Sequence, residues 1–219
     1  MESFRNADGK PILLRMVKGI QDNKAYLGEV DGLIGDGDHG MNMNKGFSLF
    51  EKRYADSSLS FSEGLNALGI VLLNEIGGSM GPIYGTVLMD MADSMEQSGA
   101  AEIGPKELAA ALNAGLEGLY DLVGARVGDK TLVDTLEPAA KAMRSAAERG
   151  IPFAQALQEM KCAAEQGRDS TRELVAKYGR SSRLGERSRG VLDAGACSCC
   201  IILTAMADGI LALLQECEA

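Results

Sequence analysis

Apolar residues recur along most of the chain at spacings of three and four, the period of an amphipathic helix. One stripe runs from Ile12 to Ile20, and others run through residues 65–76 and 108–123. No stretch alternates apolar and polar residues between hairpin turns, as a half-buried strand would. The pattern therefore predicts an all-α protein.

The same periodicity, together with helix start and stop signals, gives the predicted element boundaries. Ser60 and Glu63 have the spacing of a capping box, and we expect Pro138 either to kink its helix or to mark its first turn. Short connections favour antiparallel neighbours, and no repeat or linker is visible, so we expect one domain over residues 1–219. The sequence predicts about eight helices, at roughly 10–27, 40–53, 60–77, 80–97, 106–123, 129–149, 152–175 and 194–216.

Composition and charge narrow the function classes. With 46% hydrophobic residues and 24% charged residues, the chain has the make-up of a globular protein. A formal net charge of −9 argues against nucleic acid as a partner, because phosphates require a basic face. The longest apolar run, Ile201–Leu214, includes Asp208 and is shorter than the about 20 residues that span a bilayer. We therefore expect no membrane association.

The cysteines indicate the compartment. There are five, three of them crowded into Cys197–Cys200, and an odd number is unlike a secreted disulfide framework. The N-terminus also lacks the apolar segment of an export signal. We expect a cytoplasmic protein in which the clustered cysteines, Cys197, Cys199 and Cys200, point into the core, with no zinc site, because the cluster lacks a second cysteine pair.

A loop rich in aspartate and glycine carries the strongest chemical signal. Asp31, Asp36 and Asp38 fall within eight positions, interleaved with glycines that allow the backbone to fold tightly. Carboxylates held close together need positive charge, and oxygen ligands without cysteine select Mg²⁺ or Ca²⁺. The spacing is not that of an EF-hand, and Mg²⁺ commonly shares its ligands with a phosphate, which the following helix N-terminus would suit. The alternative is a solvated turn, and His39 beside it could contact a nucleotide or be structural.

Three further segments could take part in ligand binding. Gly77–Pro82 and Gly124–Thr131 are glycine-rich loops before helices, in which Asp129 or Thr131 could be an N-cap. Gly179–Arg189 carries four arginines, which suit phosphate, and Asp193 is expected to cap the last helix. The alternatives are tight turns between helices and a solvated run of charge. Glycine-rich or charged segments at 28–40, 124–128 and 176–193 are therefore where we expect function.

Taken in order, these motifs resemble the nucleotide-binding L subunit of dihydroxyacetone kinase. The resemblance rests on five segments and extends from about residue 10 to the C-terminus. It implies an antiparallel barrel of eight helices that binds ADP or ATP and two Mg²⁺ at one end. The segments are Gly35-Asp-Gly-Asp-His-Gly40, Asn42-Met-Asn-Lys-Gly-Phe47, Gly77-Gly-Ser-Met-Gly-Pro82, Gly128-Asp-Lys-Thr131 and Leu184-Gly-Glu-Arg-Ser188.

The resemblance also assigns residues. Asp31, Asp36 and Asp38 match the metal ligands of the family. The positions that match its nucleotide contacts are His39, Gly40, Met41, Asn42, Ser79, Met80, Gly124, Leu132, Arg180, Asp193, Ala194 and Gly195.

This chain departs from the family pattern at three places. Met80 stands where a serine is common, and Ala194 replaces a common proline. The loop from Gly124 to Gly128 looks one residue shorter, which weakens the assignment of Gly124.

In the family, a histidine on a separate K subunit holds the ketose. The only histidine here, His39, lies in the metal loop, so the resemblance implies a K partner, or another sugar-binding partner, and a phosphotransferase without its own side-chain nucleophile. Two modes fit: bound ADP rephosphorylated by a phosphoenolpyruvate-fed phosphocarrier (M) subunit, which we favour, or freely exchanging ATP. The ketose could be dihydroxyacetone or another, such as erythrulose.

Two other functions stay open. One is a nucleotide-sensing module that a transcriptional regulator reads. The other, the nucleotide domain of a fatty-acid kinase, is disfavoured because the sequence ends at 219 without a further domain.

Overall fold

The computed structural model describes residues 2–217 and confirms the all-α prediction. Beside the helices, two short strands, β1 (Phe4–Arg5) and β2 (Glu102–Ile103), pair antiparallel. The described chain also contains three 3₁₀ segments: η1 (Asn6–Asp8), η2 (Thr171–Glu173) and η3 (Arg180–Ser188). Its α-helices are α1 (Lys10–Asp22), α2 (Lys24–Ile34), α3 (His39–Tyr54), α4 (Phe61–Glu75), α5 (Met80–Ser98), α6 (Pro105–Leu122), α7 (Val133–Arg149), α8 (Phe153–Ser170) and α9 (Ala194–Cys217).

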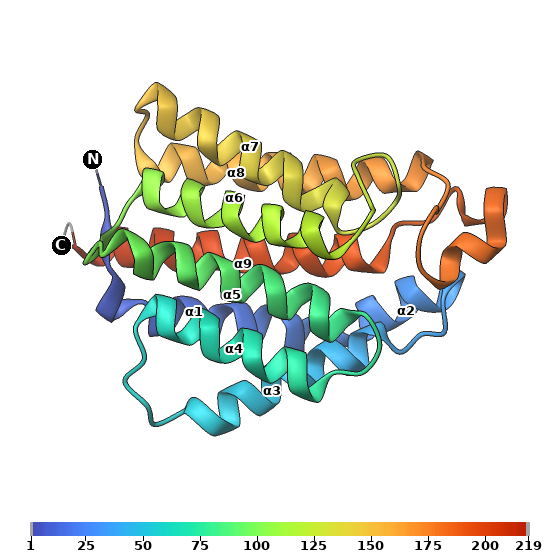
Figure 1. The fold of residues 1–219 in the computed structure, drawn as a ribbon, viewed down its shortest axis with the longest axis horizontal. Coiled ribbons are helices and arrows are strands. Elements are labelled where there is room, and N and C mark those ends of the chain that lie inside the picture. The colour runs from blue at the N-terminus through green and yellow to red at the C-terminus, as the bar shows by residue number, and fades with distance from the viewer. Residues whose placement is uncertain (1, 218–219) are drawn as a thin grey trace.

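Contacts between neighbouring helices close eight of them into an antiparallel ring. Figure 1 views this ring from the side, with the helices running along the long axis of the molecule. Helices α3 to α9 follow one another around it, and α1 closes the ring by packing against both α9 and α3. The apolar stripes face inward, so that residues such as Phe47, Leu112 and Met206 form one continuous core. Helix α2 lies at one end of the ring, beside the start of α3 (Figure 1).

The N-terminal helix is shorter than predicted, and the acidic loop is shorter too. The expected helix over 10–27 ends at Asp22, where the side-chain amide of Asn23 donates to the carbonyl of Gly19 at 2.9 Å. A separate helix, α2, then occupies most of the segment expected to be a loop over 28–40. The prediction of one helix followed by a long loop was therefore wrong, because a local side-chain hydrogen bond ends α1 early.

Other boundary predictions had mixed outcomes. The capping box is confirmed, since Ser60 Oγ accepts from the Glu63 amide and the Glu63 carboxylate accepts from the Ser60 amide. Helix α7 begins at Val133 rather than at residue 129, and Pro138 lies inside it, not in its first turn. The proline leaves the Asp134 carbonyl without its helical donor.

The last helix is longer than the apolar run suggested. Helix α9 is long and apolar enough to cross a membrane, so the expectation that this segment is too short was wrong about length. However, 67% of its apolar window is buried inside the barrel, against α1, α7 and α8. This is the pattern of a core helix. Cys197, Cys199 and Cys200 are buried in it, as expected.

Candidate functional site

A cavity of about 540 Å³ opens at one end of the barrel, where α3, α5 and α9 begin. Its size lies within the range of small-molecule sites. The structure brings twelve of the fifteen predicted site residues into its lining, although they come from segments far apart in sequence. These are Asp31, Asp36, Asp38, His39, Asn42, Ser79, Met80, Leu132, Arg180, Asp193, Ala194 and Gly195.

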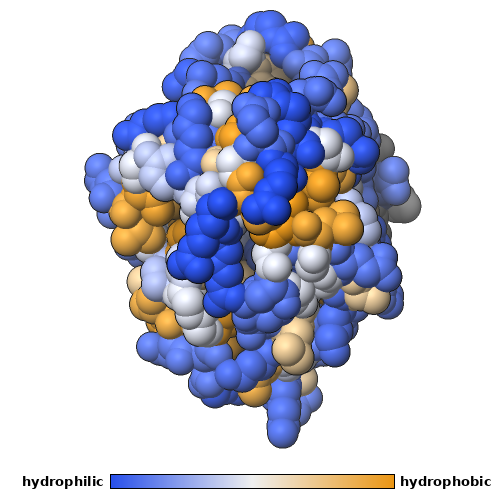
Figure 2. All heavy atoms as spheres, turned by 90° about the vertical axis from the view of Figure 1, so that its right-hand side faces the viewer, coloured by the Kyte–Doolittle hydropathy of each residue, from blue (hydrophilic) through white to orange (hydrophobic). Residues whose placement is uncertain are grey.

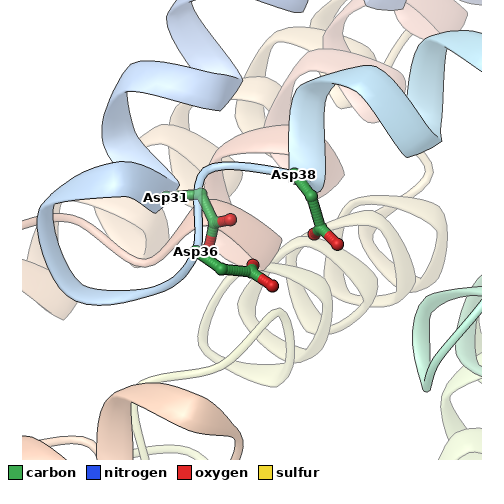
Figure 3. Close-up of side chains that lie close together, drawn as sticks. All are labelled: Asp31, Asp36 and Asp38. Carbon is green, nitrogen blue, oxygen red and sulfur yellow. The ribbon is translucent and has the colours of Figure 1, made fainter.

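The three aspartates converge on one point (Figure 3). One carboxylate oxygen from each lies within 4.8 Å of the others. Asp31 stands in the last turn of α2, and the chain then reverses through Gly37, whose φ of +77° favours glycine, to bring Asp36 and Asp38 alongside. Three hard oxygen donors at this spacing fit a divalent cation such as Mg²⁺.

Positive charge reaches this cluster from a segment that is distant in sequence. Arg180, at the start of η3, forms an ion pair with Asp36. A guanidinium placed here can also bind a phosphate, because its planar set of donors matches phosphate oxygens. The geometry therefore combines a candidate cation site with a candidate phosphate-binding arginine.

His39 is the first residue of α3 and is buried below the aspartates. Its backbone N–H points to the Asp31 carboxylate at 3.3 Å, and its Nε2 lies 2.8 Å from the Ser198 hydroxyl. Burial lowers the pKa of His39 to about 4, so the imidazole is neutral near pH 7. It can therefore act as a hydrogen-bonding group rather than as a cation.

Asp193 caps α9, as the sequence predicted. Its carboxylate accepts from the Ala196 amide at 2.7 Å, and its own amide donates to the Thr171 hydroxyl at 3.0 Å. Burial raises the pKa of Asp193 to about 6. The cap thus places a buried carboxyl group with a raised pKa in the lining of the cavity.

Lys130 is a lining residue that the sequence reasoning missed. Only 1% of it is exposed, its φ is +62°, and its ammonium donates to the carbonyls of Thr171 and Val191. The available signal was its place in Gly128-Asp-Lys-Thr131, one of the segments that carry the family resemblance, in which only Asp129 and Thr131 were given a role, as possible caps. In the structure the Thr131 hydroxyl accepts from the Val133 amide.

Asp129 has a different role from the predicted cap. Its carboxylate accepts from the Arg126 amide and pairs with Lys177 at 2.6 Å. The loop before α7 is therefore tied by Asp129 and Lys130 to the segment that carries Arg180. Tyr84 and Tyr178 also line the cavity and were not foreseen.

Three predicted residues lie outside the lining. Gly40 packs against α2, since a Cβ there would lie 2.1 Å from the Lys24 carbonyl oxygen. Met41 is 58% exposed. Gly124 lies beneath Tyr178, whose hydroxyl would be 3.1 Å from an added Cβ. A nucleotide contact by these three stays a prediction.

The surface around the cavity mixes polar and apolar side chains. Figure 2 views this end of the barrel and shows apolar patches beside strongly hydrophilic side chains. Leu33, Met41 and Val127 are each at least half exposed, and each is close in sequence to lining residues.

Comparison with known proteins identifies the family. The model of the DAK2 domain matches residues 33–208. The chain belongs to the DAK2-domain family. It is 33% identical over 188 residues to the ADP-binding subunit DhaL of a PEP-dependent dihydroxyacetone kinase of Listeria innocua, covering 85% of this chain and 88% of that one. It is 34% identical to the corresponding subunit of Escherichia coli, covering 83% and 86%.

Solved structures agree on the fold. The dihydroxyacetone kinase of C. freundii superposes with a TM-score of 0.72 at 24% identity, over 95% of this chain and 35% of that one. The same enzyme in complex with AMP-PNP and Mg²⁺ gives 0.71 at 23% identity. The DAK2 chain described here thus corresponds in fold to about a third of that kinase.

Proposed function

We propose that this DAK2 protein is the L subunit of a dihydroxyacetone-type kinase, which binds ADP or ATP and two Mg²⁺ ions. It would transfer a phosphoryl group to a short ketose held by a partner K subunit. The observation that carries the proposal is the convergence of Asp31, Asp36 and Asp38, facing Arg180, in a cavity of nucleotide size. Membership of a family of phosphotransferases supports it, as do the names of the DhaL relatives.

The chain's own residues supply charge and position. The three carboxylates would hold the cations, which when bound neutralise phosphate oxygens and so favour in-line phosphoryl transfer. Arg180 would leave Asp36 to the metal and donate to phosphate oxygens. Within the described residues, the first two amides of α5 (Met80 and Gly81) and of α9 (Ala194 and Gly195) make no hydrogen bond and would be available to ligand oxygens, whereas the Ala196 amide already donates to Asp193.

The remaining lining residues suit the nucleoside. Leu132, Ala194 and Met80 offer apolar contact for a base or sugar, and Asn42 offers an amide. We infer that no side chain at the site acts as a nucleophile; the ammonium of Lys130 donates two hydrogen bonds to backbone carbonyls. The acceptor hydroxyl therefore has to come from a substrate presented by another subunit.

The partner would dock at the cavity end. A K subunit must bring its ketose within reach of the phosphates, so it must cover the mouth. The exposed apolar side chains Leu33, Met41 and Val127 provide contact area there. We place the complex in the cytoplasm, where phosphorylated metabolites and reduced cysteines are expected.

The phosphoryl donor divides the proposal into two modes. The DhaL relatives of Listeria innocua and Escherichia coli are named as PEP-dependent, which favours bound ADP that an M-type phosphocarrier subunit rephosphorylates. The alternative is a subunit that exchanges ATP freely and serves another ketose. Relatives named as erythrulose kinases, such as that of Mycolicibacterium smegmatis (31% identity, 33% of its length), support this choice of ketose. The remaining alternative is a nucleotide-sensing role, in which a transcriptional regulator recognises the nucleotide-bound state. The same cavity would serve it.

Reconstituted phosphoryl transfer tests the proposal. The purified chain is mixed with a K-type subunit and dihydroxyacetone, with ATP in one arm and phosphoenolpyruvate plus its phosphocarriers in the other. Asp36→Asn should lower turnover roughly 10³-fold or more, since one metal carboxylate is lost. The control is Asp22→Asn, an exposed residue of α1 paired only with Lys18. Near wild-type turnover of Asp36→Asn would overturn the proposed role.

A further inference from the structure

A chain of buried hydroxyl groups extends from His39 into the barrel. Ser198 Oγ lies 2.8 Å from His39 Nε2 and 2.5 Å from the Tyr84 hydroxyl. The Tyr84 hydroxyl in turn lies 3.0 Å from the carbonyl oxygen of Gly195. Ser198 is fully buried, and Tyr84 is 5% exposed. None of these hydroxyls is part of the phosphate or metal chemistry proposed above.

The direction of the chain follows from counting protons. A carbonyl oxygen can only accept, so the Tyr84 proton must go to Gly195. Tyr84 then has no proton left for Ser198, and the 2.5 Å contact between them requires that Ser198 donates to Tyr84. Ser198 has a single proton, so its contact with His39 is made only if His39 Nε2 carries a hydrogen and donates.

The opposite arrangement leaves a contact without a proton. If Ser198 donated to His39, Tyr84 would donate to Ser198, and the Tyr84 oxygen would face the Gly195 carbonyl at 3.0 Å with no hydrogen between them. Two buried acceptors in contact are unfavourable. Donation by Ser198 to the Ala194 carbonyl, at 3.0 Å, or to the Gly195 carbonyl, at 3.2 Å, would also leave His39 as the donor.

We propose that Ser198 and Tyr84 are positioning residues that hold His39 in the Nε2–H form, so that Nδ1 is offered to the cavity as an acceptor. The inference rests on the proposed function for its ligand. That ligand is an O–H group of the bound nucleotide complex, either on the sugar or on a metal-bound water. No described residue of 2–217 makes a hydrogen bond to Nδ1, and His39 lines the cavity. A donor in the ligand would therefore find a fixed acceptor.

The single histidine makes the test direct. Protein labelled with [¹⁵N]histidine gives one pair of ring nitrogens, and NMR distinguishes the protonated from the unprotonated one. In the free wild-type protein near pH 7 we expect Nε2 to carry the hydrogen. A ring protonated at Nδ1, for example one that donates toward Asp31, or an even mixture of both forms, would overturn the proposal.

Two variants test the role of the hydroxyls. Ser198→Ala removes the acceptor of Nε2–H, and Tyr84→Phe frees the Ser198 proton to turn toward His39. Ser198→Ala should give a mixture of ring forms and weaken binding of Mg²⁺–ADP roughly three- to tenfold, and Tyr84→Phe should have an effect in the same direction but smaller, because the Ser198 proton can still go to the carbonyls of Ala194 and Gly195. Tyr84→Phe keeps the ring packed in the core, so it serves if Ser198→Ala does not fold.

The matched control is Ser62→Ala. Ser62 is 2% exposed and bonded to Asn6, but it does not line the cavity. It should leave both the ring shifts and the affinity unchanged; a change equal to that of Ser198→Ala would overturn the positioning role, as would unchanged shifts in Ser198→Ala. If wild type failed to bind Mg²⁺–ADP, the proposed function and the ligand of Nδ1 would fall, while the ring shifts of the free protein would still decide the tautomer.

Discussion

Replacing Lys130 by methionine should destabilise the protein far more than the same change at Lys177. The two lysines belong to one contact between the loop before α7 and the segment after α8. The ammonium of Lys130 is buried and donates to the carbonyls of Thr171 and Val191. Lys177 also pairs with a buried group, the Asp129 carboxylate, but 63% of the Lys177 side chain is exposed, and Asp129 keeps the hydrogen bond from the Arg126 amide when Lys177 is replaced.

The magnitude follows from the groups left without partners. Methionine keeps much of the length of Lys130 but donates no hydrogen bond, so two carbonyl oxygens lose their donor. Each unsatisfied buried polar group costs about 1–3 kcal/mol. The left-handed backbone at position 130, with φ of +62°, costs about 1 kcal/mol in the wild type and in Lys130→Met alike, because lysine and methionine both have a Cβ. This cost therefore cancels. The two unsatisfied carbonyls give an expected loss of about 2–6 kcal/mol in the free energy of unfolding of Lys130→Met.

Urea unfolding followed by circular dichroism measures this loss, with Lys177→Met as the matched control. Hydrogen exchange gives a second readout. The amide of Asp193, which donates to the Thr171 hydroxyl, should lose protection in Lys130→Met and keep it in Lys177→Met. Equal, small losses for both variants would refute the reasoning, since they would mean that water satisfies the two carbonyls.

Three further outcomes are expected. Gly40→Ala should lower the free energy of unfolding by about 1–3 kcal/mol in urea titrations, because its Cβ would meet the Lys24 carbonyl; an unchanged midpoint would contradict this. Arg180→Ala should weaken Mg²⁺–ADP binding roughly tenfold in calorimetry, whereas Arg183→Ala in the same segment should not, and equal effects would count against a phosphate contact. Burial raises the pKa of Asp193 from 3.8 to about 6, so its proton stabilises the folded state fully below pH 3.8 and this contribution is lost as pH rises through 6. In the wild type this contribution of Asp193 to the free energy of unfolding is at most about 3 kcal/mol. The free energy of unfolding of Asp193→Asn should therefore change less between pH 3.8 and 6, and identical pH profiles of the two proteins would contradict the raised pKa.

What the sequence could predict was local. Ser60 with Glu63, and Asp193 before the last helix, are patterns within a few residues that decide a helix start by themselves. The three aspartates lie within eight positions, so their convergence needed only one tight loop. Motif order then supplied the family, and with it most of the lining.

What the sequence could not predict depends on contacts between distant segments. His39 meets Ser198 across 159 positions, and Lys130 meets Val191 across 61. No periodicity encodes such pairs, because they arise only when the ring closes. The break at Asn23 was missed for a different reason: a single side-chain hydrogen bond ended a helix whose apolar pattern continued.

The central claim is that the acidic trio binds nucleotide through magnesium, and calorimetric titration with ADP tests it most directly. The purified protein is titrated with Mg²⁺ present and again after chelation, with Asp36→Asn and the control Asp22→Asn beside it. We predict tight binding only with Mg²⁺, and a large loss of affinity in Asp36→Asn alone. Equal ADP affinity with and without Mg²⁺, or an unaffected Asp36→Asn, would contradict the account.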